Sequence, residues 1–370
     1  MEKLRMAVIG AGRMGGFHAQ KLAAFPDVEL VAVCDPDADA ARRVGAACRA
    51  QALRHYGELP EQIDAAVVAT PSRLHHPIAA ELLSRGIHVL VEKPMCVCRA
   101  EADDLAALAR QQGVVLQTGH VERFNPAFVA AAPHVPAPKY IEAVRTSPFT
   151  FRSTDVGVVL DLMIHDLDLV LGLVRSPVRR VDALGLSVLG GHEDAANARI
   201  EFESGCVATL SASRVAYETQ RRMQVWSRQG FAAVDFAARK TTLVRPSEAI
   251  LRQRFCADRL SPPEVERCKQ HLFDDHLPIE RLEFEPVDAL LLELRQFIDA
   301  VRSPALSEAA LSGRDAVALA ESVLERIAQH AWDDAVDGAV GPLARPAAPL
   351  IRAPHFAPPP PATLERRKAG

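Results

Sequence analysis

The sequence lacks the features of several protein classes. Its 370 residues contain no uninterrupted apolar run that approaches the roughly 20 residues of a membrane-spanning helix. The N-terminus runs straight into an apolar strand and a glycine loop, without the long apolar region and small-residue cleavage site of a signal peptide. We therefore expect a cytoplasmic protein with no membrane partner.

Charge and cysteine content indicate no special partner either. The formal net charge is only −4 with both signs well mixed, whereas nucleic-acid-binding proteins usually carry a basic face. The seven cysteines form no CxxC pair and are odd in number, unlike a disulfide framework or a zinc site. We expect reduced thiols, no nucleic-acid partner and no metal.

The first 120 residues alternate short apolar runs with helical patterns. The runs are almost continuously apolar, as expected for a parallel sheet covered on both faces. They predict strands at Met6–Ile9, Glu29–Cys34, Ala65–Ala69, His88–Val91 and Val114–Gln117. The intervening segments predict helices at Gly15–Ala24, Ala38–Ala47, Pro77–Ser84 and Arg99–Gln111. This alternation predicts an α/β Rossmann domain, a doubly wound parallel sheet, over residues 1–120.

Beyond this region the pattern changes. Segments that alternate apolar and polar residues, joined by turn signals, favour a mostly antiparallel sheet. The predicted strands are Tyr140–Thr146, Arg180–Val188, Ala196–Phe202, Cys206–Ser213, Arg221–Ser227 and Ala232–Phe236. The predicted helices are Val156–Val174, Asp288–Val301 and Arg314–His330, and residues 247–286 receive no assignment. We predict an α+β domain with a large open sheet over residues 121–331, then a Pro/Ala-rich tail, 332–370, that we expect to be disordered.

A glycine-rich loop follows the first predicted strand. Gly10 permits the tight turn, Gly12 lets the backbone approach a pyrophosphate, and Gly15 allows close packing of the next helix. Free N–H groups at that helix N-terminus can hold phosphates. Asp35 ends the following strand, where a carboxylate accepts ribose hydroxyls and repels a 2′-phosphate, although it could also be a turn residue before Pro36. The combination predicts a dinucleotide site that favours NAD over NADP.

Two pairs of residues follow neighbouring strands at the predicted ligand-binding edge. These are Thr70 with Pro71, and Glu92 with Lys93. The Lys93 cation could stabilise a developing alkoxide or relay a hydroxyl proton. A lysine at the end of a strand is also a common surface charge.

A second polar set lies on the apolar segment Val156–Val174. If this is a helix, Asp161 and His165 share a face and Asp168 lies on the same stripe. Asp161 could orient His165, whose imidazole could take a proton from a substrate hydroxyl. A structural Asp–His hydrogen bond inside a core is the alternative, and the residues alone leave both open. A metal site lacks an obvious third ligand.

These motifs together resemble the Gfo/Idh/MocA family of NAD(P)-dependent sugar and polyol oxidoreductases. The resemblance covers roughly residues 4–330 and also rests on residues 69–75, 86–94 and 311–315, with small departures at Ser72 and Ala316. It implies that Lys93, Asp161 and His165 form the catalytic set, and that the second domain binds substrate and forms a homo-oligomer, a dimer or tetramer. It also implies NAD contacts from Gly10, Ala11, Gly12, Arg13, Met14, Gly15, Asp35, Thr70, Pro71, His75, Glu92 and Lys93.

Within the family, residues 119–126 (GHVERFNP) and 153–156 (STDV) look most like the branch that acts on nucleotide sugars. This likeness implies NAD-dependent oxidation of the C3 hydroxyl of UDP-N-acetylglucosamine, with an aminotransferase downstream that makes a 3-amino sugar for lipid A. The alternatives are an inositol or other sugar dehydrogenase and a non-catalytic NAD-binding regulator. Candidate substrate contacts are His120, Arg123, Asn125, Arg152 and His165.

Overall fold

Six parallel strands form the first of two sheets, in the order β3-β2-β1-β4-β5-β6. The computed structural model describes residues 2–151, 153–189, 191–303, 309–332 and 338–342. The strand order reverses between β1 and β4, and in doubly wound folds this point marks the ligand-binding crevice. The strands are β1 Leu4–Ile9, β2 Val28–Cys34, β3 Gln51–Leu53, β4 Ala65–Val68, β5 His88–Glu92 and β6 Leu116–Gly119.

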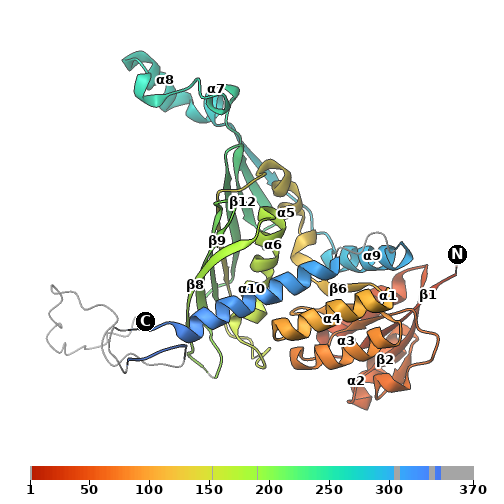
Figure 1. Cartoon of the computed structure of the whole chain (residues 1–370). Helices are drawn as coiled ribbons and strands as arrows, with labels where there is room; N and C mark the ends of the chain where they lie inside the picture. Colours follow the sequence, from red (N-terminus) through yellow and green to blue (C-terminus); the bar gives the residue numbers. More distant parts are fainter. Residues whose placement is uncertain (1, 152, 190, 304–308, 333–337, 343–370) are drawn as a thin grey trace, which may run out of the picture.

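Helices cover both faces of this sheet (Figure 1). Within β1, Met6 and Val8 pack on one face, while Ala7 and Ile9 pack on the other. This burial on both sides explains the continuous apolar runs and confirms the predicted Rossmann fold. The covering helices that follow in chain order are α1 Arg13–Ala24, α2 Ala38–Cys48, α3 His75–Ser84 and α4 Arg99–Gln112.

A helix from much later in the chain completes the first core. Helix α9, Ala289–Arg302, buries Leu294, Phe297 and Ile298 in the same cluster as Met6 and Val8. Helix α9 lies beyond residue 120 in the sequence but shares the core of the first sheet. The predicted domain boundary at residue 120 therefore stays a prediction.

Eight strands form the second sheet, in the order β14-β13-β12-β11-β7-β10-β9-β8. Neighbouring strands are antiparallel except β7 and β10, which are parallel. The predicted large, mostly antiparallel sheet is thus confirmed. Its strands are β7 Tyr140–Thr146, β8 Val178–Leu186, β9 Ala195–Phe202, β10 Val207–Ser213, β11 Gln220–Ser227, β12 Gly230–Asp235, β13 Lys240–Val244 and β14 Ile279–Glu283.

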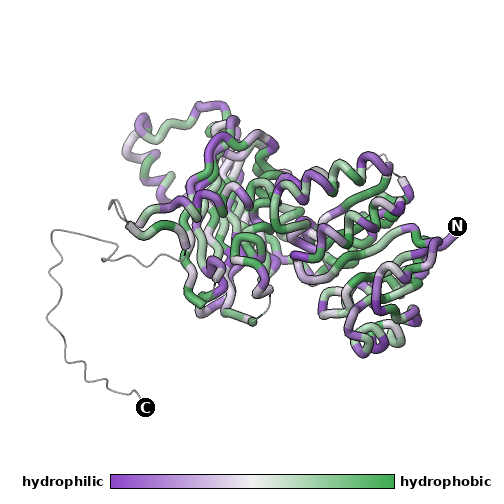
Figure 2. Tube along the Cα trace, turned by 60° about the horizontal axis from the view of Figure 1, so that its bottom comes forward, coloured by the Kyte–Doolittle hydropathy of each residue, from purple (hydrophilic) through white to green (hydrophobic). Residues whose placement is uncertain are grey.

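Three helices cover one face of the second sheet: α5 Pro126–Ala131, α6 Ile164–Val174 and α10 Ala309–Gln329. Figure 2 shows hydrophobic positions interspersed with more polar ones in this part of the molecule, as the alternating burial of the strands requires. Helix α10 also packs against α4 and β6, so it connects the two lobes (Figure 1). Gly313 permits this approach, since a Cβ there would lie 1.9 Å from Thr118 Oγ1.

The structure corrects the predicted helix Val156–Val174. Residues Val159–Met163 form a π-helical turn, and only from Ile164 does the segment continue as α6. Local contacts accompany the irregular start, because Val159 N–H donates to the Glu193 carboxylate at 3.1 Å. Such π-turns occur frequently at functional sites.

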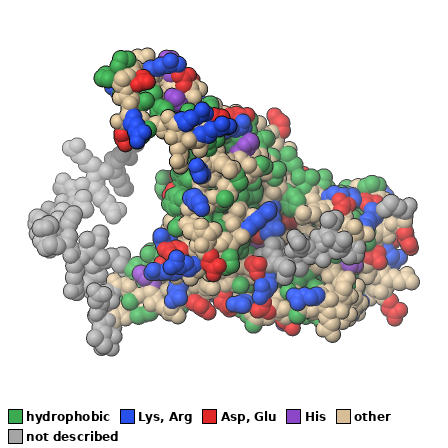
Figure 3. Space-filling model, turned by 45° about the horizontal axis from the view of Figure 1, so that its top comes forward, with side chains coloured by type: hydrophobic (Ala, Val, Ile, Leu, Met, Phe, Trp, Pro, Cys, Tyr) green, Lys and Arg blue, Asp and Glu red, His purple; other side chains and the backbone are tan. Residues whose placement is uncertain are grey.

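Three strands were missed or unassigned: β3, β13 and β14. Between β13 and β14 the chain makes an arm, with helices α7 Glu248–Leu251 and α8 Pro262–His271, that projects from the second sheet (Figure 1). Figure 3 shows charged side chains of both signs on it, and neither helix has a buried residue. The predicted tail lies almost entirely outside the described residues.

Within the described ranges, no helix combines the length and apolar character needed to cross a bilayer.

Candidate active site

The glycine loop joins β1 to α1 at the switch point of the first sheet. Gly10 has a φ of +101°, and a Cβ there would lie 2.4 Å from the Ala69 carbonyl oxygen, so this position requires glycine. Gly12 is the N-cap of α1, and no side chain caps the helix. The N–H groups of the first turn, beginning at Arg13 and Met14, are therefore available to phosphates.

A cavity of about 640 Å³ opens beside this loop. The Asp35 carboxylate lies in its wall and accepts hydrogen bonds from the N–H groups of Ala11 (2.7 Å) and Asp37 (2.9 Å). Each carboxylate oxygen retains acceptor capacity for ribose hydroxyls, so the residues present fit the adenosine half of NAD. The lining includes the predicted Gly10, Gly12, Asp35, Thr70 and Pro71, and also Arg54, His55 and Tyr56, which the sequence reasoning missed.

His75 connects the ends of two strands. It is buried, and its Nδ1 and Nε2 lie 2.8 Å from the carbonyl oxygens of Pro94 and Thr70 respectively. Both ring nitrogens are therefore engaged by the loops that follow β4 and β5. The structure gives His75 a role in shaping this edge of the cofactor cleft.

Two buried acids lie behind the site. Burial raises the pKa of Glu92, but the hydrogen bond from His18 at 2.6 Å and the charges of His18 and Lys93 outweigh burial and hold the pKa below its ordinary value. Glu293 of α9 is fully buried, and neither carboxyl oxygen has a partner among the described residues. Burial, followed by the Glu92 charge, raises the pKa of Glu293 well above its ordinary value. We infer one ionised and one protonated carboxyl.

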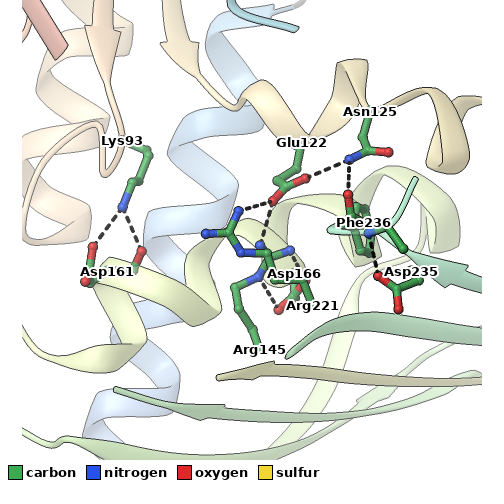
Figure 4. A network of polar contacts seen from close by, with 10 residues as sticks. Lys93, Glu122, Asn125, Arg145, Asp161, Asp166, Arg221, Asp235 and Phe236 are labelled. Atoms are coloured by element: carbon green, nitrogen blue, oxygen red, sulfur yellow. Dashed lines mark hydrogen bonds and ion pairs between the residues drawn. The ribbon is translucent and has the colours of Figure 1, made fainter. Parts of the chain in front are cut away.

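Lys93 reaches across from the first lobe to the second. Its Nζ donates to the backbone carbonyl of Asp161 at 2.7 Å and to the Asp161 carboxylate at 2.9 Å (Figure 4). The predicted Asp161–His165 hydrogen bond is wrong: among the described residues none joins them, because Asp161 holds Lys93 instead. The π-turn places the Asp161 carbonyl where this contact is possible.

His165 sits next to this pair on α6. Its Nδ1 is buried and has no partner among the described residues. Burial first, then the charges of Lys93 and Arg145, lowers the pKa of His165 well below its ordinary value. The imidazole is therefore neutral near pH 7 and able to accept a proton.

The residues predicted to contact the substrate lie in different parts of the structure. His120 is buried with its ring centroid 6.5 Å from that of His165, and burial lowers its pKa. Arg123 donates to the Asp168 carboxylate at 2.6 and 2.5 Å. Asn125 caps α5 and donates to the Phe236 carbonyl at 3.1 Å. Arg152 lies outside the described residues.

A buried arginine cluster, which the sequence reasoning missed, supports α6 from the sheet side (Figure 4). Arg145 donates to Asp166 at 2.9 and 2.8 Å and to Glu122 at 2.7 Å. All three residues are buried. The sequence did contain a signal for this cluster. Alternate residues of a strand point to the same face, and Arg145 alternates with the core residues Ile141 and Ala143. Within the described ranges, no group of three or more His, Cys, Asp or Glu residues is arranged to hold a metal ion.

Two family models match the chain. The model for the oxidoreductase family with an NAD-binding Rossmann fold matches residues 4–120, and the Gfo/Idh/MocA C-terminal domain model matches residues 129–233. The chain belongs to the Gfo/Idh/MocA family. It is therefore an NAD-binding oxidoreductase of the kind that acts on CH–OH groups of sugars and polyols.

Among its relatives in the family is UDP-N-acetylglucosamine 3-dehydrogenase from Acidithiobacillus ferrooxidans. It is 39% identical over 237 residues, which cover 64% of this chain and 75% of the relative. The solved structure of that enzyme superposes with a TM-score of 0.75 at 32% identity, covering 88% of this chain and 98% of the other.

Two other similar proteins are an inositol dehydrogenase and a protein of antibiotic biosynthesis. The NAD⁺-dependent scyllo-inositol 2-dehydrogenase of Bacillus subtilis is 28% identical over 251 residues, covering 62% of this chain and 72% of the relative. The structure of GenD2 from gentamicin A biosynthesis, in complex with NAD, has a TM-score of 0.71 at 26% identity and covers 88% of this chain and 94% of that one.

Proposed function

We propose that this protein oxidises the C3 hydroxyl of UDP-N-acetylglucosamine to a ketone. The observation that carries the proposal is that Lys93, which follows β5, donates two hydrogen bonds to Asp161 and lies near enough to His165 for its charge to lower the pKa of that imidazole. The choice of substrate is supported by the similarity to the Acidithiobacillus enzyme across both domains. NAD, held by the glycine loop and Asp35, supplies the hydride acceptor.

His165 and Lys93 have different roles in the reaction. The neutral His165 imidazole accepts the hydroxyl proton, since its lowered pKa keeps it unprotonated near pH 7. The Lys93 ammonium stabilises the negative charge that develops on the substrate oxygen. Asp161 positions Lys93 through two hydrogen bonds.

A substrate panel tests the proposal. NADH formation is followed with NAD and UDP-N-acetylglucosamine, its uronic acid form, UDP-glucose or myo-inositol. An amine donor and a cognate aminotransferase are added to pull the equilibrium toward product. We expect a signal with UDP-N-acetylglucosamine. A signal with myo-inositol alone would replace this substrate with a polyol and leave the Lys93/His165 chemistry in place.

We also propose the wider context of the reaction. The 3-keto product would pass to an aminotransferase that makes a 3-amino sugar for a lipid A type glycolipid in the cytoplasm. A homo-oligomer is supported by the second sheet's other face, which none of the helices in the described ranges covers. There the half-buried Tyr140, Trp226 and Phe231 form an aromatic cluster, in which the Trp226 ring centroid lies 5.0 Å from that of Tyr140 and 5.0 Å from that of Phe231.

A further inference from the structure

A second arginine stands at the open side of the Glu122–Arg145–Asp166 cluster (Figure 4). Arg221 lies on β11 directly opposite Arg145, so both side chains point to the helix-covered face of the sheet. The Arg145 side chain is buried, with 3% of its surface exposed, whereas the Arg221 side chain is 49% exposed. Arg221 is thus an inward-facing cation that solvent can reach.

The Arg221 guanidinium donates no hydrogen bond to any of the described residues. Its guanidinium approaches a Glu122 oxygen at 3.9 Å, but that oxygen already accepts a hydrogen bond from Arg145 at 2.7 Å. Arg145 also holds both oxygens of Asp166, so the two carboxylates nearby are already engaged. The planar fork of Arg221 is consequently free for an anionic ligand.

The charge of Arg221 acts on the catalytic centre. After burial, Lys93, Arg145 and His120, it is a further cause of the lowered pKa of His165. Arg145 connects the two sites, because it binds Asp166, the residue that follows His165 on α6. Arg221 therefore lies on the same side of the sheet as the proposed proton acceptor.

We infer that Arg221 binds the diphosphate of a nucleotide-sugar substrate while the sugar ring extends toward His165 and Lys93. This rests on the proposed function and names the anion-binding residue of the same site. A guanidinium binds phosphate oxygens through two parallel hydrogen bonds. Arg123 is the weaker candidate, because both arms of its fork are taken up by Asp168. A bound diphosphate also offsets one cation near His165, which makes the imidazole a stronger base.

Calorimetric titration with UDP, in the presence of saturating NAD, tests this inference. Arg221→Gln should weaken UDP binding by about 10- to 100-fold and raise the KM for UDP-N-acetylglucosamine similarly, with NAD affinity unchanged. Arg221→Lys keeps the charge and loses the fork, so it should restore binding only in part. The fold is not at risk, because Glu122 keeps its hydrogen bond to Arg145.

The neighbouring arginine supplies a matched control. Arg222 is next on the same strand, points to the opposite face and pairs with Asp235 at 3.2 Å. Arg222→Gln should bind UDP like the wild type. If Arg221→Gln binds UDP within about twofold of the wild type, the inference is overturned and the proposed substrate stands. A wild type that neither binds UDP nor oxidises a UDP-sugar overturns both.

Discussion

Lys93 donates hydrogen bonds to two acceptors of the other lobe, the carbonyl and the carboxylate of Asp161. Replacing it by Lys93→Met should lower kcat by on the order of 10²–10⁴-fold, because the site loses the cation that stabilises the alkoxide. NAD affinity, measured by titration, should be nearly unchanged. Lys240→Met, at an exposed ion pair with Glu283, is the control. Turnover within about tenfold of wild type would show that Lys93 has another role.

Glu293 offers a test of the buried acid pair. Its pKa is raised in the folded protein, so the stability associated with this group is fully present below the unfolded pKa and is lost as pH rises through the folded value. Glu293→Gln, which mimics the protonated acid, should therefore raise Tm relative to wild type. The gain should grow as the pH rises above the ordinary range of a glutamate carboxyl, reaching about 2–4 °C.

The control for this series is the exposed Glu285→Gln, whose Tm difference from wild type should stay near zero at every pH. A Tm difference for Glu293→Gln that does not depend on pH would mean that Glu293 is ionised in the folded protein.

At the scale of elements, Asp35 connects the end of β2 to the glycine loop through its hydrogen bond from Ala11. Asp35→Ala should weaken NAD binding about tenfold and narrow the gap to NADP, since the ribose hydroxyls lose an acceptor and a 2′-phosphate loses a repulsive charge. Titration with both cofactors measures this. Asp39→Ala, exposed on α2, should leave both affinities unchanged. If the affinities for NAD and NADP are unaltered in Asp35→Ala, Asp35 serves only as a turn residue.

The sequence predicted elements best where burial is uniform. The strands of the first sheet are buried on both faces, so their apolar runs were visible, whereas β3 has only three residues and gave no pattern. The strands β13 and β14 were not predicted, because the arm separates these two neighbouring strands in the sequence. The π-turn was invisible because a period of 3.6 was assumed throughout the apolar segment.

The candidate site was predicted as residue types more successfully than as contacts. Spacing selected Lys93, Asp161 and His165, and the structure brings them together, but it pairs Asp161 with Lys93. That contact joins residues 93 and 161 of different lobes, which no local periodicity encodes. Arg145 and Arg221 were passed over although each occupies a core-facing position of its strand, an unusual place for an arginine.

For the whole molecule, the face of the second sheet that bears Tyr140, Trp226 and Phe231 predicts assembly. Light scattering should give the mass of a dimer or tetramer, and Trp226→Asp should shift it toward smaller species, because a charge enters the aromatic cluster. Tyr217→Asp, at a side chain 90% exposed, is the control. A monomeric wild type, or an unchanged mass in Trp226→Asp, would assign this face no part in assembly.

The return of α9 to the first sheet has a consequence for synthesis on the ribosome. Residues of β1 emerge early, yet Leu294, Phe297 and Ile298, which cover Met6 and Val8, emerge only after the whole second sheet has been translated. The nascent Rossmann lobe must wait with part of its apolar face in contact with water or a chaperone. A ribosome-bound chain stalled before residue 289 should therefore be digested by protease within β1, and a chain stalled after α9 has left the exit tunnel should resist.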